Sequence, residues 1–287
     1  MSPDSSEAAD VSSTQTPRRI LMTGAAGAVG RVICPALRQR GHFVRGLDVE
    51  AGEAADEHVT GDVRDPAAVA PAAEGVDTLI HLATAVGGRD FAAHLAPTNV
   101  IGTFHVLEAA RQAGLRRAIL TSSVEVAWPP RPDGPPVRPD EPFAPRNLYA
   151  VSKACLEEMG KLYAAKTDME VLVVRLGWCP VAQVHMKYNW EKPINQSVYL
   201  SHRDAQRFFV RAVEAVLPSF AVVYAVSGAA RAVGVDPGPA AELLGFTAQD
   251  RYPDGCVLFD RPVVDGPDDP DVAYARRRKT QRSDRFP

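Results

Sequence analysis

A glycine-rich segment between an apolar run and an amphipathic run is the feature that most constrains the fold. Residues 19–23 form a short, largely apolar run, which is typical of a buried strand. The turn after them carries Gly24, Gly27 and Gly30, and apolar residues then recur with helical spacing as far as Gly41. In such a unit the first glycine permits the tight turn, the second lets the backbone approach a phosphate, and the third allows close packing of helix on strand. The segment predicts the first unit of a parallel α/β sheet.

The rest of the chain continues this alternation of short apolar runs and helical stretches. Further strands are expected near residues 43–48, 58–62, 77–83, 117–122, 170–176 and 220–226. The pattern predicts an α/β fold, a Rossmann-type doubly wound parallel sheet with helices on both faces and a small C-terminal substrate lobe. The expected organisation is a disordered extension (1–17), a cofactor-binding domain (18–180), a small substrate-binding lobe interleaved with the last strands (181–262) and a disordered charged tail (263–287).

The glycine turn and the acid after the second strand together favour NAD as the cofactor. The helix N-terminus at Ala28 and Val29 would offer free N–H groups to a pyrophosphate. Asp48 lies 18 residues after Gly30, where a carboxylate hydrogen-bonds the adenosine ribose. A carboxylate there would repel a 2′-phosphate, so NADP is the less favoured cofactor. The alternative is a glycine-rich turn that holds no nucleotide.

A tyrosine and a lysine one helical turn apart form the second informative motif. Tyr149 and Lys153 lie on a helix expected over roughly 148–165, and their spacing places them on one face. A phenol ordinarily has a pKa of about 10, and a nearby ammonium lowers it by stabilising the phenolate. Tyr149 would then exchange a proton with a hydroxyl or carbonyl while hydride moves to or from a nicotinamide. The alternative is a chance pair on a solvated helix, which the upstream glycine motif disfavours.

Two hydroxyl side chains end the strand expected over 117–122. Ligands of open α/β sheets bind beyond the carboxyl ends of the strands. Ser122 and Ser123 are therefore candidates to hold the reacting oxygen. We favour Ser123 and expect Ser122 to be structural.

In their order along the chain, these motifs resemble those of the extended short-chain dehydrogenases/reductases, the group that includes sugar-nucleotide epimerases and dehydratases. The resemblance covers roughly residues 18–262. It implies that Tyr149 and Lys153 are the catalytic pair, that Lys153 binds the nicotinamide ribose, and that the protein is a homodimer. Implied cofactor contacts come from Asp62 and Val63 at the adenine, from Leu82, Ala83 and Thr84 along the cleft, and from Asn99 beneath it. Implied substrate contacts come from Ser123, Val124, Gly177 and Trp178.

Within that group the chain is most similar to uronate dehydrogenases, which oxidise C1 of a hexuronate with NAD to give the aldaro-lactone. The shared segments are residues 174–180, 199–204 and 244–246. The resemblance implies a small sugar-like substrate that is oxidised, or formed by reduction, at a hydroxyl or carbonyl carbon.

Two departures from uronate dehydrogenases fall at the expected substrate site. Val124 and Glu125 stand where those enzymes carry an Asn-His pair after the serine. The stretch 193–197 lacks the arginine that holds the substrate carboxylate there, and Lys187 and Lys192 are the nearby cations that would replace it. A lysine does not give the bidentate grip of an arginine.

Glu125 has two interpretations. It lies two residues after Ser123, where 4,6-dehydratases of the same group place a catalytic glutamate that removes a carbon-bound proton. It would then be a second base in a redox-neutral epimerase or dehydratase that recycles its NAD. Otherwise its carboxylate binds a substrate hydroxyl or caps the following loop. A non-catalytic NAD(P)-binding regulator is a further alternative from another class of protein.

Charge and composition narrow the partners. The formal net charge of −3 gives no reason to expect a nucleic acid or a membrane as partner. The seven histidines form no metal-ligand cluster and the four cysteines no C-x-x-C spacing, so no metal is expected. The sequence shows neither a signal peptide nor an apolar stretch long enough to span a membrane, which predicts a cytoplasmic protein.

Overall fold

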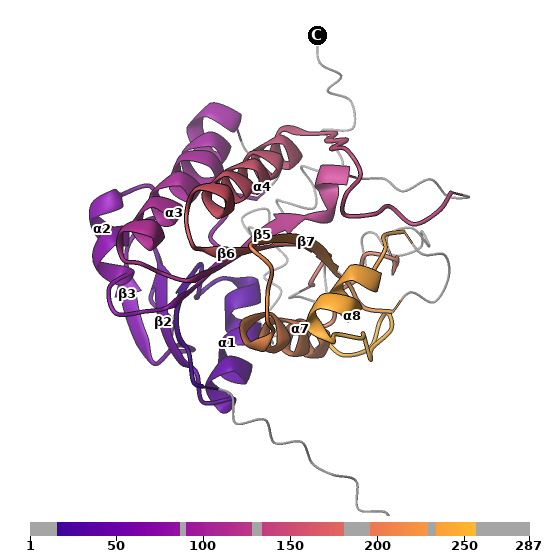
Figure 1. The fold of residues 1–287 in the computed structure, drawn as a ribbon, viewed down its shortest axis with the longest axis horizontal. Coiled ribbons are helices and arrows are strands. Elements are labelled where there is room, and N and C mark those ends of the chain that lie inside the picture. Colours follow the sequence, from indigo (N-terminus) through magenta and orange to yellow (C-terminus); the bar gives the residue numbers. More distant parts are fainter. Residues whose placement is uncertain (1–15, 87–89, 128–133, 181–195, 229–233, 257–287) are drawn as a thin grey trace, which may run out of the picture.

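A seven-stranded parallel sheet forms the centre of the molecule in the computed structural model, which describes residues 16–86, 90–127, 134–180, 196–228 and 234–256. The strands are β1 (Arg19–Thr23), β2 (Phe43–Asp48), β3 (Glu57–Thr60), β4 (Thr78–His81), β5 (Arg117–Ser123), β6 (Glu170–Leu176) and β7 (Phe220–Ala225). Their order is β3-β2-β1-β4-β5-β6-β7 (Figure 1). The order reverses between β1 and β4, and ligands of doubly wound sheets bind at this switch point. The predicted Rossmann-type fold is confirmed.

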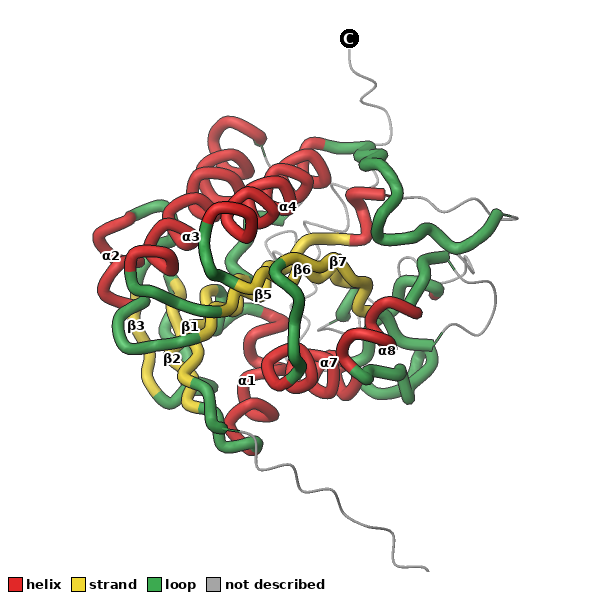
Figure 2. The backbone as a smooth tube through the Cα atoms, viewed as in Figure 1, coloured by secondary structure: helices red, strands yellow, loops and turns green. Residues whose placement is uncertain are grey.

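Helices cover both faces of the sheet (Figure 2). One face carries α2 (Pro66–Ala72), the π-helix η1 (Phe91–Ile101), α3 (Gly102–Gln112) and α4 (Leu148–Lys166). The other carries α1 (Ala28–Gln39), α7 (His202–Glu214) and α8 (Gly238–Leu244). A short 3-10 helix, η2 (Val124–Ala127), continues β5. None of the helices in the described part of the chain is both long and apolar enough to cross a membrane.

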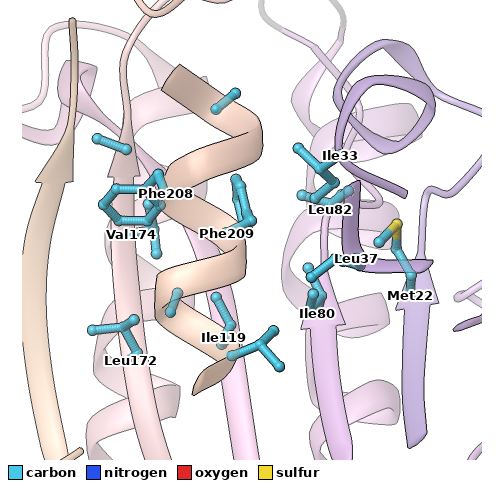
Figure 3. Packing of buried hydrophobic residues seen from close by; sticks show 14 of the residues in the cluster. Met22, Ile33, Leu37, Ile80, Leu82, Ile119, Leu172, Val174, Phe208 and Phe209 are labelled. Carbon is cyan, nitrogen blue, oxygen red and sulfur yellow. The ribbon is translucent and has the colours of Figure 1, made fainter. Parts of the chain in front are cut away.

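Alternate residues of each buried strand point to opposite faces, and each set meets its own layer of helices. Met22 of β1 belongs to the cluster that packs on α1 and α7, where Leu37 and Phe208 are also fully buried (Figure 3). Its neighbour Leu21 belongs to the second cluster, with Leu156 of α4. Full burial of one such side chain stabilises the fold by about 1.5–3 kcal/mol. The two clusters fix the positions of the strand ends, where the site lies.

The expected strands agree with the observed ones, with differences of one or two residues at several ends. The strand expected over 77–83 is shorter and runs from Thr78 to His81. The strand expected over 58–62 is shifted to Glu57–Thr60. Residues 1–15 and 257–287 and the segment with Lys187 and Lys192 lie outside the described residues. The segment after 195 contributes β7 to the same sheet, as well as α7 and α8.

Candidate active site

Two of the three glycines in the β1–α1 turn, Gly24 and Gly30, lie where an added Cβ would clash with backbone atoms. Gly24 has a φ of +74°, and a Cβ there would lie 2.6 Å from the backbone nitrogen of Ala83. A Cβ on Gly30 would lie 2.5 Å from the carbonyl oxygen of Ala25. At Gly27 the nearest atom would be the Gly24 oxygen, at 3.1 Å. The loop therefore packs closely on itself and on the end of β4, as a dinucleotide-binding turn requires.

The turn ends at a helix N-terminus beside a carboxylate. Gly27 is the N-cap of α1 and provides no side-chain cap. The first N–H groups of the helix, at Ala28 and Val29, are therefore left for a ligand at the helix N-terminus, next to the glycine loop. Asp48 ends β2 and accepts hydrogen bonds from Ala26 N at 2.9 Å and from Glu50 N at 3.2 Å. The carboxylate is thus fixed against the glycine loop, and its remaining lone pairs suit a ribose hydroxyl.

Asp62 and Val63 follow β3, which pairs with β2, so they lie at the same sheet edge as Asp48. Asp62 forms an ion pair with Arg64, whose Nε donates across 2.8 Å, and these bonds lower the pKa of the carboxyl. Val63 is buried against Gly102, where a Cβ would come within 2.8 Å of its Cγ2. Val63 thus packs beneath this edge of the cleft, while Asp62 carries a neutralised charge.

Asn99 connects the segment that follows β4 to α4. Its side chain is buried in η1 and accepts from Ala85 N at 2.7 Å and from Thr84 Oγ1 at 3.1 Å. Its amide donates to Ser152 Oγ at 3.0 Å, and Ser152 Oγ in turn donates to the carbonyl oxygen of Tyr149. Leu82 and Ala83 form the neighbouring part of the cleft wall, beside Gly24. The structure therefore brings these predicted cofactor residues together.

His81 supports the cleft from within the sheet. The Thr103 hydroxyl donates to the carbonyl oxygen of Asn99, so it accepts from His81 Nε2, and His81 Nδ1 accepts from Thr23 Oγ1 at 2.7 Å. Burial, and to a smaller extent the charge of Lys153, lowers the pKa of His81 to about 3. His81 is therefore a neutral, hydrogen-bonded core residue.

The predicted catalytic pair lies in the first two turns of α4. Tyr149 is half-buried, whereas Lys153 is only 2% exposed. Lys153 Nζ donates to the carbonyl oxygen of Thr121 at 2.9 Å and lies 5.8 Å from the centroid of the Tyr149 ring. Burial lowers the pKa of Lys153 to about 7, against a smaller opposing effect of Glu157. The amine can therefore gain or lose a proton close to neutral pH, next to a phenol.

Ser123 is the last residue of β5, two residues after Thr121, to which Lys153 bonds. Its Oγ accepts a hydrogen bond from the backbone N–H of Glu125 at 3.2 Å. The Glu125 side chain accepts from Asn147 Nδ2 at 2.6 Å, and Asn147 Oδ1 caps α4 by accepting from Ala150 N. Thus the segment after β5 is tied directly to the residue that starts the catalytic helix. Sequence reasoning missed Asn147, although an asparagine just before an apolar helical stretch is a recognisable N-cap signal.

A buried ion pair supports the catalytic helix from below, and it too was missed. The Glu157 carboxylate accepts hydrogen bonds from Nε and Nη2 of Arg175, each at 3.0 Å, and from the hydroxyl of Ser122 at 2.5 Å. Arg175 Nη1 also donates to the hydroxyl of Tyr224. Ser122 thus points away from Ser123 into this cluster. Glu157 is four residues after Lys153, so helical spacing could have placed it on the same buried face.

The predicted substrate residues are placed unequally. Val124 is 7% exposed and belongs to a small apolar cluster with Tyr224, so its side chain packs in the interior. A Cβ on Gly177 would lie 2.5 Å from the Val198 carbonyl oxygen. The backbone N–H of the half-buried Trp178 donates to that same oxygen. These contacts fix the turn after β6 at the carboxyl edge of the sheet. Lys187 and Lys192 lie outside the described residues.

The C-terminal part of the chain is joined to this turn by the segment that begins α7. Ser201 is the N-cap of α7, and its Oγ accepts a hydrogen bond from Asp204 N at 2.9 Å. His202 Nε2 lies 2.6 Å from the carbonyl oxygen of Pro180. No group of His, Cys, Asp and Glu side chains suited to a metal occurs among the described residues.

Comparison with known proteins agrees with this geometry. Residues 20–178 match the model of the NAD dependent epimerase/dehydratase family. The chain is 32% identical over 227 residues to a uronate dehydrogenase of Pseudomonas syringae pv. tomato, an alignment that covers 76% of this chain and 78% of the relative. It is 35% identical over 215 residues to an L-arabinose 1-dehydrogenase (NAD(P)+) of Haloferax volcanii, covering 70% and 84%. A crystal structure of uronate dehydrogenase from Agrobacterium tumefaciens, a mutant complexed with NAD, superposes with a TM-score of 0.71 at 28% identity and covers 82% of this chain and 86% of that one.

The fold and the Tyr–Lys site define an NAD-dependent short-chain dehydrogenase/reductase of the extended type. The chain belongs to the NAD dependent epimerase/dehydratase family.

Proposed function

We propose that the protein oxidises the anomeric carbon, C1, of a small free sugar to a lactone with NAD. The single observation that carries this proposal is that Lys153 lies beside the Tyr149 ring and bonds to Thr121, two residues before Ser123, in a sheet whose first turn is a glycine loop shaped for a dinucleotide. The relatives named as uronate dehydrogenase and L-arabinose 1-dehydrogenase support a sugar substrate and, in the second case, reaction at C1.

The residues divide the reaction between them. Ser123 Oγ would hold the C1 hydroxyl, and Tyr149 Oη would accept its proton. NAD supplies the acceptor for the hydride that leaves C1, so the hemiacetal becomes a lactone and NADH is formed. Lys153 in its ammonium form stabilises the phenolate of Tyr149, because a positive charge beside a phenol lowers its pKa. The Lys153 amine would also hold the nicotinamide ribose.

For the cofactor we propose NAD in preference to NADP. Asp48 Oδ2 is held 2.9 Å from the N–H of Ala26, so the carboxylate cannot swing away from the glycine loop without losing this bond. A 2′-phosphate placed there would meet a fixed negative charge. The remaining cofactor contacts proposed are those of Asp62, Val63, Leu82, Ala83, Thr84 and Asn99.

A redox-neutral epimerase or dehydratase is the second candidate function, and one observation favours it. The carboxylate of Glu125 is held by Asn147 close along the chain to both Ser123 and Tyr149. A second base near the reacting carbon is what such an enzyme needs. This candidate predicts a changed sugar without accumulation of NADH.

The test is absorbance at 340 nm with the purified protein, excess NAD and a panel of free aldoses and hexuronates. We expect NADH to form, at a rate that Tyr149→Phe reduces about 10³-fold, as loss of a general base does. Tyr163→Phe is the matched control, because Tyr163 lies on the same helix with its hydroxyl 3.1 Å from Glu108 Oε2. Full activity of Tyr149→Phe would exclude the proposed role of this phenol.

A further inference from the structure

A glutamate–asparagine pair joins the two chain segments that carry the catalytic hydroxyls. Glu125 lies two residues after Ser123, and Asn147 lies two residues before Tyr149. Asn147 Nδ2 donates to Glu125 Oε2 across 2.6 Å, while its Oδ1 accepts from Ala150 N. The backbone N–H of Glu125 donates to Ser123 Oγ. Both ends of Glu125 are therefore positioned, the backbone N–H at Ser123 and the carboxylate at the residue two before Tyr149.

The chemistry of a fixed carboxylate at this place distinguishes between sugars. An ionised carboxylate only accepts hydrogen bonds and has several lone pairs to offer. Every hydroxyl of a neutral sugar can donate to it. A sugar carboxylate cannot donate, and two negative charges a few ångströms apart repel one another, more strongly in a partly buried site than in water. Glu125 is half-buried.

Two buried cations, Arg175 beside β5 and Lys153 on α4, are already engaged, whereas Arg146, three residues before Tyr149, is exposed. Arg175 is 2% exposed and donates to Glu157 and Tyr224. Lys153 donates to the carbonyl oxygen of Thr121 and is needed beside Tyr149. Arg175 cannot turn to hold a substrate carboxylate without breaking these contacts, and Lys153 is assigned to Tyr149 and the nicotinamide ribose in the proposed function.

We propose that Glu125 is a specificity residue that selects an uncharged aldose over a hexuronate. Its carboxylate accepts a hydrogen bond from a sugar hydroxyl, and Asn147 keeps it in position for this. The proposal rests on the proposed function, because it concerns which sugar is bound for oxidation at C1. In this role Glu125 removes no proton from carbon, which distinguishes it from a second base.

The test uses two pairs of sugars that differ only at C6: D-glucose with D-glucuronate, and D-galactose with D-galacturonate. For each, kcat/KM is measured at 340 nm with NAD for the wild type, Glu125→Gln and Glu158→Gln. Glu158 is an exposed residue of α4, so its variant controls for the loss of one negative charge. We expect the wild type to prefer the neutral sugar of each pair. We expect Glu125→Gln to shift the ratio about tenfold toward the uronate, since a charge-assisted hydrogen bond and a repulsion are both lost.

Asn147→Ser provides a second variant that does not change the charge. Serine is also a favourable N-cap, so α4 keeps its cap while the amide that holds Glu125 is removed. We expect a shift in the same direction of about threefold, as loss of one hydrogen bond gives.

The outcomes separate the two proposals. A higher kcat/KM for the uronates in the wild type, or a ratio that Glu125→Gln leaves unchanged, overturns the specificity role and leaves C1 oxidation standing. Absence of NADH with all four sugars overturns both. A changed sugar without NADH, lost in Glu125→Gln, overturns both in favour of the second-base function.

Discussion

The two regions proposed to bind the cofactor and the substrate, called here the cofactor end and the substrate end, are built by different means. At the cofactor end the shape comes from the backbone: glycines without a Cβ, a helix N-terminus and one carboxylate that accepts from main-chain N–H groups. At the substrate end it comes from side chains of distant segments, such as Glu125 with Asn147 and Arg175 with Glu157. The first kind of site is fixed by local sequence and suits a ligand shared by a whole family. The second can change one pair at a time, which suits a variable substrate.

The largest effect that would sharpen this comparison is expected from Arg175→Met. The substitution leaves the carboxylate of Glu157 buried with only the Ser122 hydroxyl of its present partners. Removing one partner of a buried ion pair typically costs about 3–5 kcal/mol. We expect a loss of this size in the free energy of unfolding, measured by urea titration with NAD absent.

The matched control is the double variant Arg175→Met/Glu157→Met. Apolar replacement of both partners is often close to neutral, so most of the lost stability should return. A single variant as stable as the wild type would mean that the substrate end does not depend on this ion pair.

In the cofactor end the corresponding change is Gly30→Ala. Its Cβ would lie 2.5 Å from the oxygen of Ala25 and 2.6 Å from that of Gly24, both backbone atoms that cannot rotate away. Overpacking of this kind costs about 1–3 kcal/mol, and it moves the loop that would face the pyrophosphate. We expect lower stability together with at least about tenfold weaker NAD binding, by isothermal titration calorimetry.

Gly238→Ala is the control for this change. Its Cβ would meet only the Asp236 side chain, at 3.0 Å, in a helix remote in sequence from the loop. We expect NAD binding to be unaffected. Unchanged binding in Gly30→Ala would contradict the view that backbone shape decides the cofactor end.

The same difference explains what could be predicted from the sequence. Gly24, Gly27, Gly30 and Asp48 act through local geometry, so their spacing was sufficient to place the turn and its carboxylate. The parallel sheet followed from short apolar strands that are buried on both faces.

Partnerships across the sheet were not predictable in this way. Glu125 was recognised as unusual, but its bond to Asn147 spans 22 residues and depends on where a loop returns to α4. Ser122 was expected to be structural, yet its partner Glu157 was unknown until the strand and the helix were placed side by side. Val124 was assigned to the substrate by resemblance, and its burial in an apolar cluster could not be derived from its position next to Ser123.

A smaller effect, a gain in the free energy of unfolding where the first two variants lose it, is expected when Lys153 is replaced. Its pKa is about 7 in the folded protein, below the ordinary 10.5, because burial disfavours the charged form. Below pH 7 both the folded and the unfolded chain carry the proton, so the cost of burial is complete. It declines as the pH rises toward 10.5. We therefore expect Lys153→Met to raise the free energy of unfolding by about 2 kcal/mol at pH 7, less than the full shift because the hydrogen bond to Thr121 is lost.

The measurement is urea unfolding of both proteins at pH 7 and pH 9.5. The wild type should gain stability relative to Lys153→Met between these values, since the unfolded chain binds more protons there. Turnover should be lost in the variant. A variant less stable than the wild type at pH 7 would show that Lys153 contributes to packing more than its burial costs.

The smallest expected effect tests whether Asp48 faces the adenosine ribose. Asp48→Asn keeps an acceptor for the N–H of Ala26 and removes the charge that would repel a 2′-phosphate. We expect the ratio of kcat/KM with NADP to that with NAD to rise about tenfold, equivalent to about 1.4 kcal/mol. Glu50→Gln is the control, because Glu50 is exposed two residues later and its variant changes the net charge equally. If both variants shift the ratio alike, general charge explains cofactor choice. If only Asp48→Asn shifts it, the cofactor end needs one carboxylate in addition to its backbone shape.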